Sequence, residues 1–282
     1  APLVATPASK YRSTAPDVPT LVAPPDGANV AAPVTSLVVH VTDPEQDALE
    51  VKFYGRPVVP GREPFALVAL PDTQYYSQTY PQIFSAQTQW VVDNRDARQI
   101  AYVGHEGDIV NYPYEDYQWQ NADAALSILD TLPDLPYGLA VGNHDQWPHP
   151  NGTVTFNTYF PYTRYEARPW YGGHYGSDND NHYVLFTGGG MDFIAIHFEY
   201  DMSANPAVLS WAGSLLQAYP ERRALVTCHS VIDGSGNWSA QGAAVYGALK
   251  VYRNFFLILC GHAGPEVLRT DVPAGAEEQV RG

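Results

Sequence analysis

Apolar and polar residues alternate along most of this chain between runs typical of buried strands and runs with helical spacing. Strand-like runs cover residues 65–74, 98–108, 135–145, 192–201, 223–230 and 255–262. Helical spacing is found at 81–97, 116–131, 206–219 and 241–250. Strands that alternate with helices predict an α/β domain with largely parallel pairing. A Tyr-, Gly- and Asn-rich excursion, expected to be a long loop insertion, interrupts the alternation at 146–182.

The first part of the chain follows a different pattern. Residues 1–20 are rich in Ala, Pro and Thr without an apolar core, so we expect a flexible leader at a mature N-terminus. Residues 21–62 carry two alternating patterns separated by turn residues, which predicts a small all-β, sandwich-like module. The α/β domain is then expected to occupy residues 63–282.

Charge and composition narrow the class of partner. The 30 acidic and 15 basic residues give a formal net charge of −15, which disfavours nucleic-acid polymers and anionic membrane surfaces. No apolar run is long enough to span a bilayer, and 24 prolines, 20 tyrosines and sequons at Asn151 and Asn237 favour a secreted protein, extracellular or periplasmic. We expect Cys228 and Cys260 to be buried thiols rather than a disulfide.

Polar side chains follow five of the predicted strands at the point where each strand ends. They are Asp72, Asp108, Asn143 with His144, His229 and His262. A single Asp after a strand is usually a cap or turn residue, and a lone His is usually structural. Together, however, carboxylates, an amide and imidazoles form the mixed ligand set that holds divalent Mn, Fe or Zn. The loops at the carboxyl ends of parallel strands line one crevice, so we expect these side chains to converge.

These motifs resemble the signature of the calcineurin-like metallophosphoesterase superfamily. The matching segments read PDTQ, EGDIVN, GNHD, TCHS and GHAG, and the likeness covers roughly residues 65–265. The resemblance implies a β-sandwich flanked by helices. The β-module before it resembles the immunoglobulin or fibronectin-like domains that precede secreted members of that superfamily.

The resemblance also implies roles for individual residues. Asp108 would bridge two metal ions, and Asn143, His229 and His262 would complete one of the two sites. Asp72 would contribute to the other site, together with Gln74 at the position of the motif's first histidine.

His144 would stand beside the scissile phosphate. Two roles are open for it: it acts as the general acid, or it stabilises the developing charge. Asp145 is expected to be its orienting partner.

The sequence departs from the superfamily pattern at Gln74 and at Gly264, where the motif has histidines. The second metal site is therefore expected to be weak, although a glutamine carbonyl can coordinate a hard cation and Glu266 or His105 could fill the gap. Further strands are expected after His262, so either the chain is truncated after Gly264 or its last layer is unusually small.

Aromatic residues near the motifs suggest a rim for a sugar, nucleoside or lipid-like leaving group. The candidates are Tyr75, Tyr76, Trp147, Tyr162, Trp170 and Tyr171. Tyr75, Tyr76 and Trp147, with His105, are the expected substrate contacts, while simple loop packing is the competing explanation.

The sequence therefore predicts a metal-dependent phosphoesterase that hydrolyses phosphomonoesters or phosphodiesters with a metal-activated hydroxide. Its substrate would be a small phosphate ester. The alternative is a non-catalytic, metal-stabilised protein that binds a glycan or a protein partner, and Gln74 and Gly264 favour that alternative.

Overall fold

The computed structural model describes residues 20–23, 36, 38–44, 63–150, 152–264 and 267–271. The chain divides into two compact units, residues 1–57 with 280–282 and residues 58–279. Residues 1–19 of the predicted leader, the sequon residue Asn151, Glu266 and the tail after residue 271 lie outside the described residues, whereas Thr20, predicted as the end of the leader, begins a strand. Among the described residues, no helix is both long and apolar enough to cross a bilayer.

The described part of the first unit is a pair of antiparallel strands. Strand β1 (Thr20–Ala23) pairs with β2 (Val38–His40), and Thr20 lies opposite His40. The rest of the predicted β-module lies outside the described residues, so its likeness to an immunoglobulin-type domain stays a prediction.

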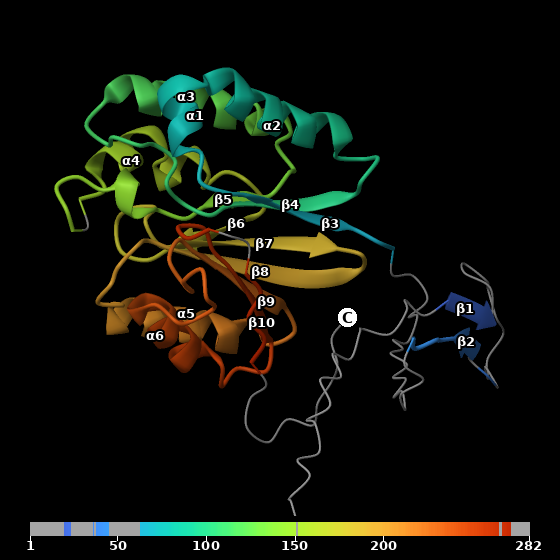
Figure 1. Cartoon of the computed structure of the whole chain (residues 1–282). Helices are drawn as coiled ribbons and strands as arrows, with labels where there is room; N and C mark the ends of the chain where they lie inside the picture. The colour runs from blue at the N-terminus through green and yellow to red at the C-terminus, as the bar shows by residue number, and fades with distance from the viewer. Residues whose placement is uncertain are drawn as a thin grey trace, which may run out of the picture. The chain divides into compact units, whose positions relative to one another are not determined.

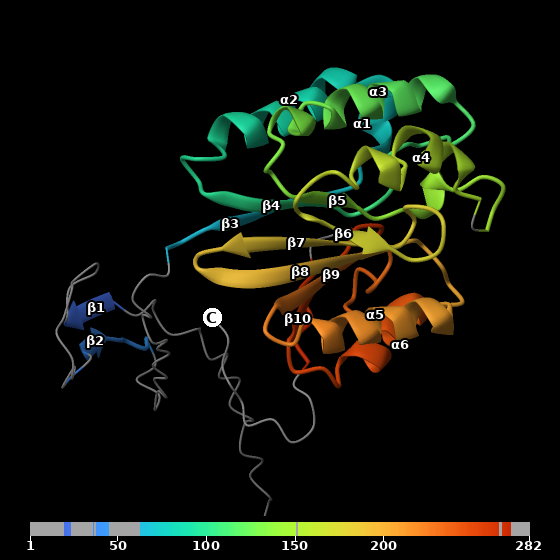
Figure 2. The same ribbon diagram turned by 180° about the vertical axis from the view of Figure 1, so that it is seen from behind.

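The second unit contains two sheets that face each other. The first is a parallel sheet in the order β3 (Ala66–Leu70), β4 (Ile100–His105) and β5 (Tyr137–Leu139). Its outer side is covered by helices α1 (Gln74–Thr79), α2 (Pro81–Asn94) and α3 (Asp116–Leu126), with the short α4 (Val154–Tyr159) beside α3 (Figure 1; Figure 2).

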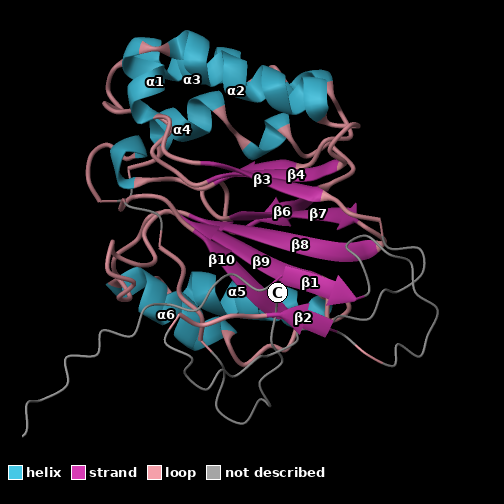
Figure 3. Cartoon of the chain, turned by 45° about the vertical axis from the view of Figure 1, so that its right-hand side comes forward, coloured by secondary structure: helices cyan, strands magenta, loops and turns pink. Residues whose placement is uncertain are grey.

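The second sheet has five strands in the order β10-β9-β8-β7-β6. Strands β8 (Met191–Phe198), β9 (Arg223–Cys228) and β10 (Phe255–Leu259) run parallel, whereas β6 (Tyr171–His174) and β7 (His182–Gly188) add antiparallel pairs. Helices α5 (Pro206–Ala218) and α6 (Ala240–Leu249) cover its outer face (Figure 3).

Strand β8 illustrates how alternation builds the two layers of the core. Phe193 and Ala195 belong to the cluster between the sheets, whereas Ile194 and Ile196 pack against α5 and α6. Successive strand residues point to opposite faces, so a strand that is buried on both faces is apolar at nearly every position. The predicted α/β class, with helices on the outside of packed sheets, is confirmed.

The two sheets approach each other closely at β5 and β8. The Tyr102 hydroxyl on β4 lies 2.8 Å from Nε2 of His197 on β8, and both side chains are fully buried. A side chain at Gly138 on β5 would overlap the ring of His197, so this position requires glycine. The contact fixes the distance between the sheets and therefore between the loops at their ends.

The excursion at 146–182 is more ordered than the sequence suggested. It contains α4, the short helix η3 (Tyr162–Arg164) and β6, and it ends where β7 begins. Strand β7, which the sequence reasoning missed, forms a hairpin with β8 through Gly189 and Gly190, both with positive φ (56° and 70°). The pairing on this side of the sheet is antiparallel, so the expectation of largely parallel pairing was wrong there.

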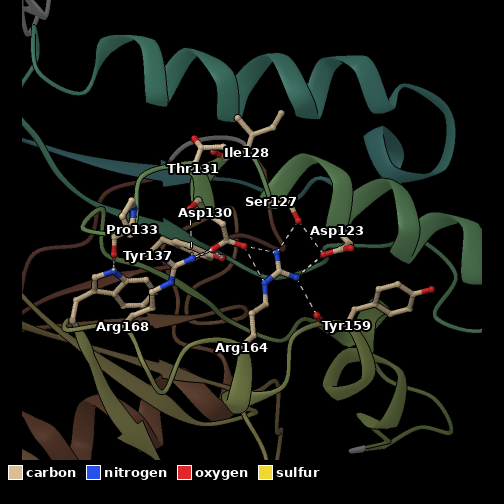
Figure 4. A network of polar contacts seen from close by, with 11 residues as sticks. Asp123, Ser127, Ile128, Asp130, Thr131, Pro133, Tyr137, Tyr159, Arg164 and Arg168 are labelled. Atoms are coloured by element: carbon tan, nitrogen blue, oxygen red, sulfur yellow. Dashed lines mark hydrogen bonds and ion pairs between the residues drawn. The ribbon is translucent and has the colours of Figure 1, made fainter.

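A partly buried arginine ties this excursion to the first layer of helices (Figure 4). The guanidinium group of Arg164 donates hydrogen bonds to Asp123 on α3, to Asp130, to the Ser127 hydroxyl and to the carbonyl oxygen of Tyr159. Because the Arg164 side chain is only 17% exposed, these partners compensate for the water it loses on folding.

Candidate metal centre

Four of the predicted ligand residues lie together where the carboxyl ends of the two sheets meet. Asp108 follows β4, Asn143 follows β5, and His229 and His262 follow β9 and β10. Donor atoms of Asp108, His229 and His262 all lie within 4.8 Å of one another.

Three of these contacts converge on one atom, Nε2 of His229. It lies 3.1 Å from Oδ2 of Asp108, 3.1 Å from Oδ1 of Asn143 and 3.1 Å from Nδ1 of His262. One ring nitrogen carries at most one proton, so it cannot donate a hydrogen bond to all three neighbours. Ligands about 2.0–2.1 Å from a shared cation stand roughly 3.0–3.4 Å apart, so the observed spacing fits a metal site.

The other nitrogen of His229 is held by the backbone. Its Nδ1 lies 2.9 Å from the carbonyl oxygen of Glu106, so Nδ1 donates a proton and directs Nε2 toward the cluster. A hydrogen bond of this kind fixes the tautomer and the ring orientation of a metal-binding histidine. Burial by itself would lower the pKa of His229. The hydrogen bond to Asp108 and the negative charge of that carboxylate outweigh burial, so the pKa of His229 is raised.

Backbone geometry places Asp108 and its neighbours. Asp108 itself has a positive φ of 50°, and its Oδ1 accepts a hydrogen bond of 2.9 Å from the backbone N–H of His144. A side chain at Gly142 would overlap Oδ1 of Asp108, which explains the glycine before Asn143. Gly142 of the GNHD motif therefore lets the loop after β5 approach the Asp108 carboxylate on the loop after β4.

Asp72 lies next to this cluster but not within it, and Gln74 follows two residues later at the start of α1. The carboxylate of Asp72 accepts hydrogen bonds of 3.4 Å and 3.2 Å from the backbone N–H of His262, and its Oδ1 is 3.8 Å from Nδ1 of His229. The side-chain oxygen of Gln74 is buried without a hydrogen-bond partner among the described residues. An orphaned buried oxygen fits a cation ligand, because a buried acceptor otherwise needs a donor.

Glu106 is an acidic neighbour that the sequence reasoning missed. Glu106 is buried, with 8% of its surface exposed. Burial, followed by the charge of Asp72, raises its pKa to about 7. Burial also raises the pKa of Asp72. A buried and a half-buried carboxylate that repel each other favour a cation between them. The sequence signal was present, because Glu106 stands two residues before Asp108 in the EGD motif.

His144 and Asp145 do not form the expected pair. Nδ1 of His144 lies 2.9 Å from the backbone oxygen of Asn111. The two oxygens of Asp145 instead accept hydrogen bonds from the backbone N–H groups of Val110 and Gly142. Asp145 is 1% exposed and therefore holds two loops in place rather than orienting His144. The assignment of Asp145 as the partner of His144 is corrected accordingly.

His105 lies beneath the site rather than at its surface. It is 1% exposed, with Nε2 2.9 Å from the Thr73 hydroxyl and Nδ1 accepting a hydrogen bond from Gly107. Burial lowers its pKa to about 3, so the ring is neutral. Both nitrogens are engaged, so we do not retain His105 as a substrate contact or as a replacement ligand.

The predicted aromatic rim is divided by the structure. Tyr75 and Trp147 are exposed, at 61% and 52%, whereas Tyr76 packs partly against the core. Trp170 is buried and donates to the carbonyl oxygen of Pro133. Loop packing also accounts for the other two rings, because Tyr162 stacks on His174 and Tyr171 stacks on Tyr165.

Tyr200 is another neighbour that the sequence did not single out. Its ring centroid lies 6.1 Å from that of His229 and 6.0 Å from that of His262. It follows β8, which was not among the strands whose ends carried predicted ligands. The packing of β8 beside β9 and the hydrogen bond from the Tyr200 backbone N–H to the carbonyl oxygen of Val141 bring this tyrosine to the candidate centre.

Cys228 and Cys260 directly precede the segments that carry His229 and His262, and both are free thiols, as expected. Cys228 is buried, whereas Cys260 is only partly buried, which corrects the expectation of two buried thiols. An open cavity of about 540 Å³ lies near Phe65, Arg95 and Asp134, at the amino ends of β3 and β4. None of the candidate ligands lines it, so its size does not mark it as the site of chemistry.

No protein-family model matches the chain. The chain is 34% identical over 215 residues to the uncharacterized protein YvnB of Bacillus subtilis strain 168, a match that covers 76% of this chain but spans only 16% of YvnB.

Among solved structures, the chain is similar to the purple acid phosphatase PPD1 from seeds of yellow lupin (Lupinus luteus). The TM-score is 0.45 at 16% sequence identity, and the match covers 64% of this chain and 33% of the phosphatase chain.

Proposed function

We propose that this chain is a metal-dependent phosphoesterase that hydrolyses phosphomonoesters or phosphodiesters at the cluster of Asp108, Asn143, His229 and His262. The convergence of three ligand atoms on Nε2 of His229 carries the proposal. The hydrogen bond from Nδ1 to Glu106 supports it, because it leaves Nε2 as the ligand atom.

Two groups of residues would hold cations. Asp108, Asn143, His229 and His262 suit Mn, Fe or Zn, because they combine oxygen and imidazole nitrogen ligands. Asp72, Gln74 and Glu106, with Asp108 shared, offer only oxygen ligands, so a second cation would be a harder ion and more weakly held. Bound cations would supply positive charge to the phosphate oxygens and acidify a water molecule.

His144 is the residue of this chain that we assign to the leaving group. The carbonyl oxygen of Asn111 accepts from Nδ1, so Nε2 is the ring atom left to face a substrate. In its protonated form Nε2 would donate a proton to the departing oxygen or stabilise its charge. Half-burial of His144 suits either role, because a substrate can reach it.

The substrate that fits this proposal is small. With a net charge of −15, the chain has no general attraction for anions, so a phosphate group must be held locally by the centre. The sequence composition further supports a secreted protein, which we propose as its location.

Hydrolysis assays on metal-depleted protein test the proposal. The protein is stripped with chelator and supplied separately with Mn, Fe, Zn or Ca, and turnover of 4-nitrophenyl phosphate is compared with that of bis(4-nitrophenyl) phosphate. Asp108→Asn removes the central carboxylate. Asp192→Asn is the matched control, because Asp192 is an exposed carboxylate at the β7–β8 hairpin.

We expect at least one metal to restore turnover in the unmodified and Asp192→Asn proteins, with a loss of at least about 100-fold in Asp108→Asn. Absence of turnover with every metal, in a folded protein, would contradict the proposal. Loss of thermal stability on chelation without any turnover would favour the metal-stabilised binding protein instead.

A further inference from the structure

A row of exposed aromatic rings lies on the loops after β4 and β5. The rings of Tyr112 and Tyr114 are stacked with centroids 5.7 Å apart, and Trp147 meets Tyr114 edge-on at 5.5 Å. His149 extends the row, 6.1 Å from Trp147. Tyr112, Tyr114 and Trp147 are 42%, 58% and 52% exposed, and we refer to these three as the aromatic row.

The aromatic row is connected to the candidate site through the backbone at both of its ends. Asn111, whose carbonyl oxygen holds His144, directly precedes Tyr112. Trp147 follows His144 by three residues on the loop after β5. The two loops that carry the aromatic row are therefore the same loops that position His144.

Neighbouring hydrogen bonds hold the aromatic row in place. The buried Gln118 side chain accepts from the backbone N–H of Tyr112, and the buried Trp119 indole donates to the carbonyl oxygen of Pro113. The backbone N–H of Trp147 donates to the carbonyl oxygen of Gly152 at 2.6 Å. A surface that is ordered before binding loses little conformational entropy when a ligand arrives.

The chemistry of the row selects the kind of group it would contact. Its surface consists of ring faces and edges, which stack on flat π-systems. The next residues, Glu115 and Asp116, are exposed acids, which disfavour a further phosphate or carboxylate on the ligand. The fitting ligand is therefore a single phosphate attached to an uncharged flat ring.

We propose that the aromatic row stacks on the leaving group of the substrate, so that this site takes phosphate esters of flat rings, either aryl or nucleoside, in preference to alkyl or sugar phosphates. This inference rests on the proposed function for the position of the phosphate. It adds Tyr112 and Tyr114, which lie outside the aromatic rim expected from the sequence.

Binding of two phosphonates that differ only in the ring tests the stacking independently of turnover. Phenylphosphonate and methylphosphonate both have a carbon–phosphorus bond that a phosphoesterase does not cleave. Their dissociation constants are measured by calorimetry on Mn-loaded protein, for the unmodified chain and for Tyr114→Ala and Trp147→Ala. Trp90→Ala is the matched control, because Trp90 is 45% exposed on α2 and contacts Arg98.

We expect phenylphosphonate to bind the unmodified chain about tenfold more tightly than methylphosphonate. In Tyr114→Ala and in Trp147→Ala, this ratio of dissociation constants should fall by a factor of about five or more. The dissociation constant of methylphosphonate should not change in these variants. The Trp90→Ala variant should bind both phosphonates as the unmodified chain does. Equal affinity for both phosphonates, or an equal loss for both in the variants, would overturn the inference. If phenylphosphonate is preferred but no ester is hydrolysed, the stacking stands and the proposed function fails.

Steady-state kinetics distinguish aryl esters, nucleoside esters and sugar phosphates as substrates. KM is compared for phenyl phosphate, adenosine 5′-monophosphate and ribose 5-phosphate with the same variants. A lower KM for either ring-bearing ester, lost in Trp147→Ala, supports the inference and names aryl or nucleoside esters as the class. A lowest KM for ribose 5-phosphate would overturn it in favour of sugar recognition.

Discussion

Nδ1 of His229 lies 2.9 Å from the backbone carbonyl oxygen of Glu106. This contact joins the loop after β9 to the loop after β4, and so it links the two sheets at the candidate centre. Because the carbonyl can only accept, Nδ1 must donate, and Nε2 faces Asp108 and His262. The carbonyl oxygen of Glu106, on the loop after β4, therefore sets which nitrogen of His229 serves as the ligand atom.

Replacing His229 should remove the most central ligand. We expect His229→Ala to weaken Mn or Zn binding by more than about 100-fold, since even the outer partners of a metal ligand contribute 10–100-fold. Calorimetric titration of chelator-treated protein measures the effect. His174→Ala, which removes a ring stacked on Tyr162, is the control and should keep the parental affinity. Similar affinities in both variants would show that the cluster is not the metal centre.

Restoring histidines at Gln74 and Gly264 should strengthen the second cation site. Among the described residues, no atom other than those of Gly264 and its two chain neighbours lies within 4 Å of the place where a Cβ at Gly264 would stand, so a side chain can be added there. We expect the Gln74→His, Gly264→His double variant to retain about one additional cation per chain after dialysis, measured by elemental analysis. Gly247→His, at an equally open position on α6, should leave the metal content unchanged. An unaltered content in the double variant would refute this assignment of the second site.

Removing the guanidinium group of Arg164 should destabilise the fold. Arg164→Met leaves Asp123 without its guanidinium partner and leaves Asp130 with only Arg168 and Tyr137, so we expect a loss of about 2–4 kcal/mol in the free energy of unfolding. The corresponding Arg95→Met change breaks the Arg95–Asp134 pair, whose aspartate is 65% exposed, and should cost less than about 1 kcal/mol. Urea unfolding compares the two variants, and equal losses would argue against a structural role for the Arg164 network.

Stability should fall as pH rises through the titration of Glu199. Burial, followed by the charge of Asp180, raises the pKa of Glu199 from 4.5 to about 7. Between these values the folded state retains a proton that the unfolded chain has released, so its contribution is full below pH 4.5 and is lost by about pH 7.

Urea unfolding at pH 5 and pH 8 measures this contribution, which we expect to be on the order of 1–3 kcal/mol. Glu199→Gln keeps the acceptor for Asn181 and should reduce the pH dependence, with Glu106 supplying part of what remains, whereas the exposed Glu221→Gln should leave it unchanged. A parental slope in Glu199→Gln would contradict the raised pKa.

Much of the centre was readable from local sequence. Each predicted ligand follows an apolar run, and a buried strand must end in a loop when its apolar run ends. Asp108, Asn143, His229 and His262 could thus be placed at strand ends without knowing the fold. Strand β7 escaped because the Gly-rich residues around it masked a short alternating pattern.

The partners of these residues could not be read in the same way. Asp145 follows His144 directly, yet its carboxylate turns to Val110 and Gly142 while His144 turns to Asn111. His105 precedes the EGD motif but points into the core. Side-chain direction in a loop depends on dihedral angles and on distant donors, which residue spacing does not encode.

By itself the sequence determined the α/β class and which residues stand at the ends of strands, because hydrophobic periodicity is a local property of the chain. Only the tertiary structure decided that β3, β4 and β5 form one sheet and β9 and β10 part of another, with their ends meeting at His229. It also left Tyr112, Tyr114 and Trp147 exposed while burying Trp170. Hydrophobic periodicity predicts which face of a strand is buried. Which part of the protein covers that face depends on packing between segments that are far apart in the chain.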